Sequence, residues 1–423
     1  MHKNWLAVFI FALLLVLPSK TTASGFAIYE HGIRANGFAG AFTGLADDAS
    51  AIYYNPAGLS FLSPGKHMLF GSTIIIPKLT WNALDSEPWH EPRSVDTKFK
   101  VFPPVNLHYT STSESGFAWG IGLYNPFGLG VFWPDEPKED WPGRTTIVEI
   151  NLETFFLSPT VSYKLSDKLS LAAGINLVHG IVGLKKRNST SIDGVEPLAD
   201  LSGSGNAIGF NLGAMFKPLE ELSLGLNYRH SVDLDFEGDS EFTETGDLEP
   251  FLVGGDISTS ITLPRSVTMG LSYKLTDKFL INADYMMVGW SSFDTLIIDF
   301  AVNNSFQTDL RSPKRYEDSW NIRIGGEYIY SDVLSVQVGF LYDINPVPDE
   351  YFEPLLPDSD RTGFALGFDY MLNEKMSLNL SYIHLLFKER ETNLDLSNDE
   401  FVNFHGRYTA FAPLIGFGIG YDL

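Results

Sequence analysis

The side chains of this chain that could hold a metal are scattered, and one short stretch brings several of them together. Asp233, Asp235 and Glu237 alternate with apolar residues before Gly238, and Glu244 follows six residues later. This order nearly fits a calcium loop, in which carboxylates surround the cation and a glycine makes the sharp turn. Because a glutamate stands where aspartate or asparagine is expected, we interpret the stretch as an acidic edge between strand and loop. Loop carboxylates of this kind could still bind divalent cations loosely.

Sequence motifs for catalysis or nucleotide binding do not accompany that stretch. The nine histidines are dispersed without an H-E-x-x-H pair, and no serine lies in G-x-S-x-G. The run from Gly416 to Gly420 has a glycine at every second position. It superficially resembles a nucleotide turn, but it fits one face of a strand. We therefore expect no cofactor, no metal and no catalytic residue.

Composition excludes several kinds of partner. The net charge is −23 and cysteine is absent. An acidic chain does not bind nucleic acid, because phosphate contacts need a basic surface. The same charge argues against a peripheral protein that is held on anionic lipid by a basic face. Without cysteine there is neither a disulfide framework nor a cysteine metal site.

The first residues predict export from the cytoplasm. Lys3 precedes an apolar run at 6–18, and small residues follow as far as Ala23. This is the pattern of a secretory signal peptide, which we assign to 1–23, so that the mature chain begins near Ser24. The apolar run is short for a membrane anchor, and no later stretch contains eighteen consecutive apolar residues.

Tight turns recur along the rest of the chain and set its architecture. Each has an aromatic residue, a short polar turn with an acid, and then a hydrophobic alternation, which is typical of a β-hairpin. The flanking segments alternate with period two, as at Ile415, Phe417 and Ile419, with glycines between them. Alternation of this length is the signature of a transmembrane β-barrel, although a soluble sandwich would also alternate. The turns lie at 163–171, 216–224, 273–281, 328–336 and 370–378, with a looser sixth near Ser113.

The connections between these hairpins are long, polar and acidic. Short turns on one side and long loops on the other are the outer-membrane pattern. Six hairpins supply twelve strands. Strands at about 66–77 and 405–422 bring the count to fourteen, so we predict an all-β, antiparallel, closed transmembrane barrel over 66–423. The long connections are expected at 125–147, 188–202, 237–254, 293–314, 343–361 and 388–404.

Residues 24–65 precede the first strand and lack its alternation. A fourteen-stranded barrel leaves a lumen that strand side chains alone do not fill. The segment is rich in alanine and glycine and is broken at Asn55–Pro56. We therefore predict a compact hatch of short helical turns inside the lumen. Asp47 and Asp48 suit a helix N-terminus or a polar contact in the lumen, and Pro56 directs the chain toward the wall.

This segment resembles the N-terminal hatch of FadL-type outer-membrane transporters of hydrophobic compounds. The resemblance rests on the Gly25–Phe26 start, the run 46–50 that includes Asp47 and Asp48, and LPDSDR at 356–361. It implies a passive channel for long-chain fatty acids or hydrocarbons, with binding in the lumen near the mature N-terminus and release sideways through the wall. One departure is that the chain ends on Leu423 rather than on an aromatic residue. The hatch residues are Asp47, Asp48, Asn55, Pro56, Ala57 and Gly58.

The resemblance also implies a kink in the third strand, because an opening in the wall needs an interrupted ladder. The stretch 116–133 is rich in glycine and proline. Alternatively, Asn125–Pro126 only begins the outer loop, since 116–124 already supplies most of a spanning strand. The residues expected at the kink are Gly120, Gly122, Asn125, Pro126, Phe127 and Gly128.

For the ligand, the resemblance implies an apolar pocket with a basic group near its carboxylate end. We expect Phe26 and Ile28 in the pocket. Leu129, Val131, Phe132 and Trp133 would form an outer apolar groove, or alternatively an interfacial aromatic girdle. The carboxylate partners expected are Arg187, Arg315 and Arg361, each of which could instead be a solvated loop or lumen charge. If none faces the pocket, a neutral hydrocarbon becomes the better ligand.

The expected partners follow from the same reading. They are hydrophobic small molecules, including detergent in crystals, the lipid and lipopolysaccharide of the outer membrane, and the barrel-assembly machinery. The protein is expected to be a monomer. Two alternatives stay open, a lipid hydrolase with a serine–histidine pair assembled across strands and a general porin or adhesin barrel. A porin usually folds a long loop inward and needs no segment such as 24–65.

Overall fold

A computed structural model gives the fold. The structure describes residues 25–84, 93–136, 141–190, 192, 194–304, 307–392 and 406–423, and the predicted signal peptide lies outside these ranges. Within them, no helix has the length and apolar character that a membrane crossing requires.

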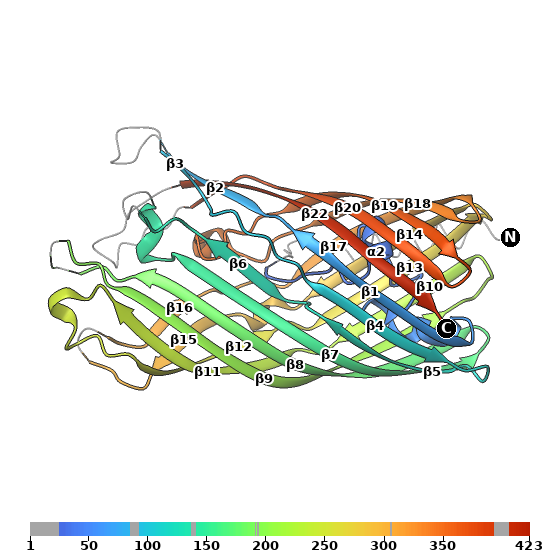
Figure 1. Cartoon of the computed structure of the whole chain (residues 1–423), viewed down its shortest axis with the longest axis horizontal. Coiled ribbons are helices and arrows are strands. Elements are labelled where there is room, and N and C mark those ends of the chain that lie inside the picture. The colour runs from blue at the N-terminus through green and yellow to red at the C-terminus, as the bar shows by residue number, and fades with distance from the viewer. Residues whose placement is uncertain are drawn as a thin grey trace.

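The described strands form one closed antiparallel sheet, which confirms the predicted fourteen-stranded barrel. The last strand closes it, because β22 (Gly406–Asp422) pairs with β20 on one edge and with β1 on the other. Tight turns and the C-terminus lie at one end of the barrel, and the longer connections lie at the other (Figure 1). Closure pairs the first strand with the last, so that the sheet has no free outer edge in a lipid environment.

Several of the fourteen strands are kinked and therefore appear as two segments. The unbroken ones are β7 (Glu149–Ser166), β8 (Leu169–Arg187), β9 (Leu198–Phe216), β18 (Leu334–Asp343), β19 (Arg361–Asn373) and β22. The kinked ones are β1/β2 (Gly65–Ile75, Lys78–Ala83), β3/β4 (Ser94–Asp96, Val105–Thr112), β5/β6 (Phe117–Tyr124, Gly128–Phe132), β10/β11 (Leu222–Arg229, Val232–Thr243), β12/β13 (Gly255–Leu263, Ser266–Thr276), β14/β15 (Phe279–Val288, Thr295–Phe300), β16/β17 (Leu310–Pro313, Ser319–Ser331) and β20/β21 (Met376–Phe387, Arg390–Thr392).

Short helical segments complete the described chain. They are α2 (Ile33–Gly37), α3 (Ala51–Tyr54), η1 (Pro56–Phe61), η2 (Pro142–Thr145), η3 (Gly246–Leu248), η4 (Trp290–Ser292) and η5 (Asp349–Tyr351).

Strand β8 shows why these sequences form a membrane wall. Leu171, Ile175 and Leu177 are exposed on the outer surface, whereas Ser170 and Asn176 are completely buried on the inner one. Successive side chains of a strand point to opposite faces. Apolar groups therefore meet lipid while small polar groups meet the lumen.

The long connections are shorter than predicted. Strand β9 already begins at Leu198, β11 continues to Thr243, and the range 293–314 contains both β15 and β16. Polar outward residues suggested loops there. The strands nevertheless continue as paired ladders, because backbone pairing does not require an apolar outer face.

Residues 25–62 lie inside the barrel, and we call them the hatch. Segment α2 packs against β18, β19 and β20, and η1 packs against β7, β8 and β9. The hatch is the blue coil visible within the wall in Figure 1. Asn55 fixes its centre, since its Nδ2 donates to the carbonyls of Thr43 and Ala214, both at 3.0 Å. One of these contacts lies within the hatch and the other joins it to the wall.

Glycines of β1 and β22 leave the space into which the hatch docks. Ile33 is completely buried. A Cβ added at Gly418 or at Gly71 would lie 2.8 Å from Ile33 Cγ1. Since contacts this short do not occur between real side chains, these two positions must lack a Cβ for α2 to dock.

We therefore expect Gly418→Val to displace α2 while leaving the ladder of β22 intact. Overpacking of this kind typically costs about 1–3 kcal/mol. Limited proteolysis should then cut within the hatch of the folded barrel. Gly183→Val is the matched control, because the nearest atom to a Cβ at Gly183 is 4.0 Å away. Equal protease resistance of the two variants would contradict this account of the seat.

Candidate functional site

The wall is interrupted between its second and third strands. Strand β5 pairs with β4 up to Leu107 and Leu123, whereas β6 pairs with β7. The next backbone hydrogen bond between the second and third strands in the described residues runs from Lys98 N to Phe132 O, at 2.7 Å. A stretch of the third strand therefore has no ladder partner on one side.

The kink itself lies at Asn125, Pro126 and Phe127. Tyr124 pairs with Phe156 and Gly128 with Glu153, so these three residues stand opposite two of β7. Such an excess is a β-bulge, which bends the strand. Because the strand resumes as β6, Asn125–Pro126 does not simply begin the outer loop.

The Asn125 side chain replaces backbone bonds that the kink removes. Its Oδ1 accepts from Val105 N at 3.1 Å, and its Nδ2 donates to Thr154 O at 2.8 Å. Gly120 and Gly122 lie earlier, inside the paired part of β5. A Cβ on either would lie about 3 Å from Ile52, at 2.9 and 3.0 Å respectively. These two glycines therefore admit the hatch rather than interrupt the wall.

The start of the hatch pairs with the kink. Ile28 N donates to Pro126 O and Gly128 N donates to Phe26 O, both at 2.9 Å. Ala27 and Phe127 form the bridge between these bonds. Residues 26–28 therefore act as a short added strand at the point where the wall lacks a partner.

Phe26 extends from this added strand into an aromatic cluster. Its ring lies edge-on to those of Trp290 and Phe293, with centroids 4.7 and 5.6 Å away, and 6.1 Å from Phe127. Edge-to-face pairs of this kind hold a ring in one orientation. Phe26 thereby becomes one wall of a cavity.

That cavity is lined almost entirely by apolar groups. Glu237 is the one ionisable residue among those that line it. Ligand pockets for small molecules are mostly hydrophobic, with a small number of polar groups. We call it the apolar cavity. Its lining includes Phe26, Leu129, Ile150, Leu152, Leu184, Leu201, Phe236, Ile257, Ile261, Phe293, Ile298 and Leu356.

Most of these lining residues were missed at the sequence level because the alternation changes phase along the wall. In β10, Asn227 and Arg229 face inward, and in β11 the inward residues are Leu234 and Phe236. The break at 230–231 shifts the parity by one. The inner face therefore changes from polar to apolar.

The same shift explains the acidic stretch. Asp233, Asp235 and Glu237 are exposed positions of β11, between inward apolar residues. In the part of the chain that the structure describes, no group of three or more acids and histidines could hold a metal. The alternation of acids with apolar residues indicates a strand with a polar outer face and an apolar inner face. The similarity of the stretch to a calcium loop drew attention away from that alternation.

Of the expected groove residues, Leu129 lines the apolar cavity and the others do not. Val131, Phe132 and Trp133 are nevertheless buried, so they do not form an exposed girdle. Trp133 stacks on Trp141, with ring centroids 3.9 Å apart. These side chains tie β6 to the outer connections.

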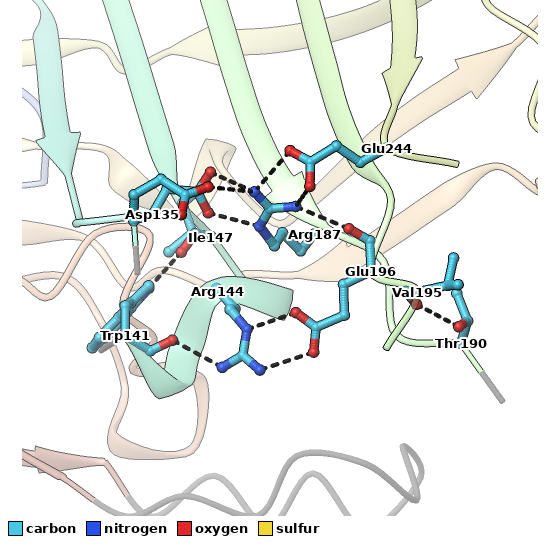
Figure 2. A network of polar contacts seen from close by, with 10 residues as sticks. Asp135, Trp141, Arg144, Ile147, Arg187, Thr190, Val195, Glu196 and Glu244 are labelled. Carbon is cyan, nitrogen blue, oxygen red and sulfur yellow. Dashed lines mark hydrogen bonds and ion pairs between the residues drawn. The ribbon is translucent and has the colours of Figure 1, made fainter. Parts of the chain in front are cut away.

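Arg187, at the end of β8, is enclosed by a polar network (Figure 2). Its Nε lies 2.8 Å from Asp135 Oδ1, and its Nη1 lies 3.3 Å from Glu244 Oε2 and 2.9 Å from Glu196 O. Arg144 binds the Glu196 carboxylate at 2.7 Å. The network joins the connections that follow β6, β8 and β11.

Neither Arg187 nor the other two expected carboxylate partners lines the apolar cavity. Arg361 pairs with Asp343 at 2.8 Å across β18 and β19. Arg315 is exposed and has a φ of 46°.

Asp358 anchors the first described residue. Its Oδ2 accepts from Gly25 N at 2.8 Å. Burial raises the pKa of this carboxyl to about 7, although Arg361 acts in the opposite direction. Asp358 lies within the LPDSDR stretch. The structure thus joins the two separated segments that carry the sequence resemblance.

We expect Arg187→Met to destabilise the outer connections without changing the preference of the protein for one ligand over another. Breaking the ion pairs of a buried arginine should lower stability by about 1–3 kcal/mol, since its partners can hydrate. The uptake ratio of oleate to toluene by expressing cells should equal that of the wild type. Arg311→Met, at an exposed position, is the control. A selective loss of oleate would instead show that Arg187 meets the carboxylate.

Comparison with known proteins agrees with this geometry. The profile of the family described as "Outer membrane protein transport protein (OMPP1/FadL/TodX)" matches residues 14–423. The long-chain fatty acid transport protein of Escherichia coli K12 is 22% identical over 411 residues, which cover 87% of this chain and 90% of that protein. Outer membrane protein P1 of Haemophilus influenzae is 24% identical over 467 residues, covering 97% of each.

Solved structures share the fold. A Pseudomonas aeruginosa FadL homologue superposes with a TM-score of 0.82 at 19% identity, covering 94% of this chain and 100% of that one. The Pseudomonas putida toluene transporter TodX gives a TM-score of 0.74 at 17% identity, covering 96% and 99%.

Proposed function

Because the chain belongs to the OMPP1/FadL/TodX family of outer-membrane transport proteins, we propose that it binds hydrophobic molecules in its lumen and releases them sideways into the membrane. The protein is an outer-membrane transport protein for hydrophobic compounds and not an enzyme. The fatty-acid and toluene transporters among its relatives and neighbours suggest the range of ligands. The path through the wall is the part that we infer.

The apolar cavity is the observation that carries the proposal. It lies beside Phe26, next to the part of the lumen that is lined by polar residues. The inner face of the wall changes there from polar in β10 to apolar in β11. Each CH₂ that enters it from water contributes about 0.8 kcal/mol. A hydrophobic molecule therefore collects there without any energy source.

Sideways release follows from the interrupted ladder. An apolar molecule gains nothing by entering the aqueous periplasm, whereas the lipid beside the barrel is as favourable as the cavity. Residues 26–28 lie between the apolar cavity and the kink, since Phe26 lines the cavity and Ile28 binds Pro126. Movement of this short strand would open the gap. The hatch, expected over 24–65, would keep the remaining lumen closed.

The lining also constrains the ligand. Among the described lining residues Glu237 is the one ionisable residue, and its side chain is on the exposed face of β11. No described cation lines the cavity, so a carboxylate buried there would have no partner. A molecule held wholly within the apolar cavity is therefore neutral. A carboxylate must have its charge held elsewhere.

The proposal is tested by uptake into whole cells that express the full chain or an empty vector. Labelled toluene, dodecane and oleate should enter faster in the expressing cells, whereas a water-soluble sugar should enter at the same rate in both. If each of the three hydrophobic probes entered expressing and empty-vector cells at the same rate, the proposal would be overturned. Faster entry of the sugar as well would indicate a general porin.

A further inference from the structure

Three lysines gather on the outer surface where β2, β3 and the link to β4 meet. Lys78 begins β2, whereas Lys98 and Lys100 lie in the link 97–104, which joins β3 to β4. All three are exposed, and we call them the lysine patch. Strands β2 and β3 lie at the end of the barrel that carries the longer connections (Figure 1). In an outer-membrane barrel this end faces the cell exterior.

The charges of the lysine patch are mostly uncompensated. Lys78 has a partner, because its Nζ lies 3.0 Å from Asp96 Oδ2. Within the part of the chain that the structure describes, neither Lys98 nor Lys100 forms an ion pair. The Nζ of Lys100 lies 4.5 Å from the ring centre of Phe132, and an aromatic face stabilises a cation without neutralising it. Three lysines against one carboxylate leave an excess of positive charge on a chain whose net charge is −23.

The pairing of β2 with the segment that follows β3 brings like charges together. The two strands are antiparallel, and just beyond β3 Thr97 N donates to Leu79 O at 2.9 Å. The same register, continued by one residue, places Lys98 opposite Lys78. Like charges that face each other on neighbouring strands are unfavourable. An anion bound between the two ammonium groups would relieve this repulsion.

The lysine patch lies at the outer edge of the apolar band of the barrel. Lys78 pairs with Phe411 of β22, and both side chains are exposed. From Phe411 toward the C-terminus the outer face stays apolar, as at Ile415, whereas in the other direction Arg407 is exposed. On β4 the apolar outer face begins at Val105, directly after the link. The lysines therefore stand where the lipid-facing surface gives way to a polar one.

The link 97–104 is fixed to the wall on both sides. Lys98 N donates to Phe132 O at 2.7 Å, and Phe102 exchanges backbone hydrogen bonds of 2.8 and 3.0 Å with Ile75. Phe99, between two of the lysines, is 77% exposed. A ring exposed to this extent is unfavourable in water and suits the region of lipid acyl chains. The link thus presents cationic and apolar groups together on a fixed backbone.

We propose that the lysine patch binds the phosphate groups of an outer-leaflet lipid, the lipid A part of lipopolysaccharide, with Phe99 among its acyl chains. Ammonium groups bind phosphate as compact point charges. The phosphates of this lipid lie where its acyl chains end and its sugars begin, which is the depth of the lysine patch. The site is independent of the proposed path for hydrophobic compounds.

The outer surface of β11 shows that the site is local. Beyond the break at 230–231, the exposed residues of β11 include Asp233, Asp235 and Glu237. Carboxylates repel phosphate groups, so lipid A should not bind in this way beside β11. The lysine patch therefore selects one position around the barrel.

The test is native mass spectrometry of the full chain in detergent micelles, titrated with bisphosphorylated lipid A or with its dephosphorylated form. The wild type should bind the bisphosphorylated form at least about tenfold more tightly, because lysines at the membrane surface attract anionic headgroups. The double variant Lys98→Gln/Lys100→Gln should lose about tenfold or more in affinity for that form and bind the dephosphorylated form unchanged. The double variant Lys98→Arg/Lys100→Arg keeps the charge and should retain the affinity.

A matched control removes the same charge from the other end of the barrel. Lys278 and Lys375 are exposed in the tight turns before β14 and β20. Lys278→Gln/Lys375→Gln should bind both lipid forms as the wild type does. The electrophoretic mobility of unheated samples reports whether each variant is a closed barrel. Inorganic phosphate, added at the concentration of the lipid, should not compete.

Equal binding of the two lipid forms by the wild type would overturn the proposal, as would unchanged affinity of the Lys98→Gln/Lys100→Gln variant. An equal loss in the control variant would reveal a general charge effect and would also overturn it. Competition by inorganic phosphate would assign the lysine patch to free phosphate instead of lipid. None of these results would count against the proposed function, because uptake is not part of the measurement.

Discussion

Deletion of Pro126 should nearly abolish the uptake of hydrophobic compounds while leaving a folded barrel. Three residues, 125–127, now stand opposite two of β7. Removing one of the three leaves two residues opposite two of β7. Tyr124 would still face inward opposite Phe156, and Gly128 would still face outward opposite Glu153. The third strand can then run straight and pair on both sides. We expect initial uptake to fall by at least about tenfold, equivalent to a barrier raised by about 1.4 kcal/mol.

The matched control for this deletion is Pro126→Ala. It keeps three residues opposite two, so the bulge and the uptake should both survive. Uptake of labelled dodecane by expressing cells measures the rate, and 1-decanol binding to the purified protein shows whether the apolar cavity is intact. Normal uptake by the deletion variant would rule out this kink as the exit.

The barrel was predictable because its signals are local. The turn after Tyr163 and the alternation at Ile415, Phe417 and Ile419 each define a hairpin or a strand face without knowledge of the rest of the chain. Backbone pairing then requires closure. The structure agrees, since β22 pairs along both edges.

The apolar cavity was not predictable in the same way, because period-two alternation does not state which face meets lipid. Leu226 is exposed on the outside of β10, whereas Leu234 is completely buried on the inside of β11. The two differ in parity because of the break at 230–231. Only the acids beside Leu234 reveal the change, since acids avoid the membrane.

The arginines show a further limit. Sequence reasoning favoured arginines at strand ends and in loops, such as Arg187, whose charge is satisfied by Asp135 and Glu244. The inward direction of Arg229 could be read from the alternation of β10. Its hydrogen bonds to Tyr124 Oη and Tyr53 O could not, because they depend on how the hatch folds against β10. Whether any of these arginines meets a ligand stays a prediction.

The apolar inner face beyond the break in alternation leads to one further prediction with a large effect. Ile261 is 7% exposed and lines the apolar cavity. Ile261→Asp would put a carboxylate into a surface that no described cation lines. We expect 1-decanol affinity at neutral pH to fall by about 30-fold or more, equivalent to about 2 kcal/mol, because the charge brings water into the cavity.

Ser260→Asp is the matched control, because Ser260 is the next residue of β12 and is exposed on the outer face. The same charge there should leave 1-decanol binding unchanged. A second check is the pH dependence of the Ile261→Asp variant. The apolar surroundings favour the neutral carboxyl, so its pKa should be raised and affinity should recover as the pH falls. Misfolding would not be reversed by acid. Equal affinities of the two aspartate variants at neutral pH would mean that the ligand does not occupy this cavity.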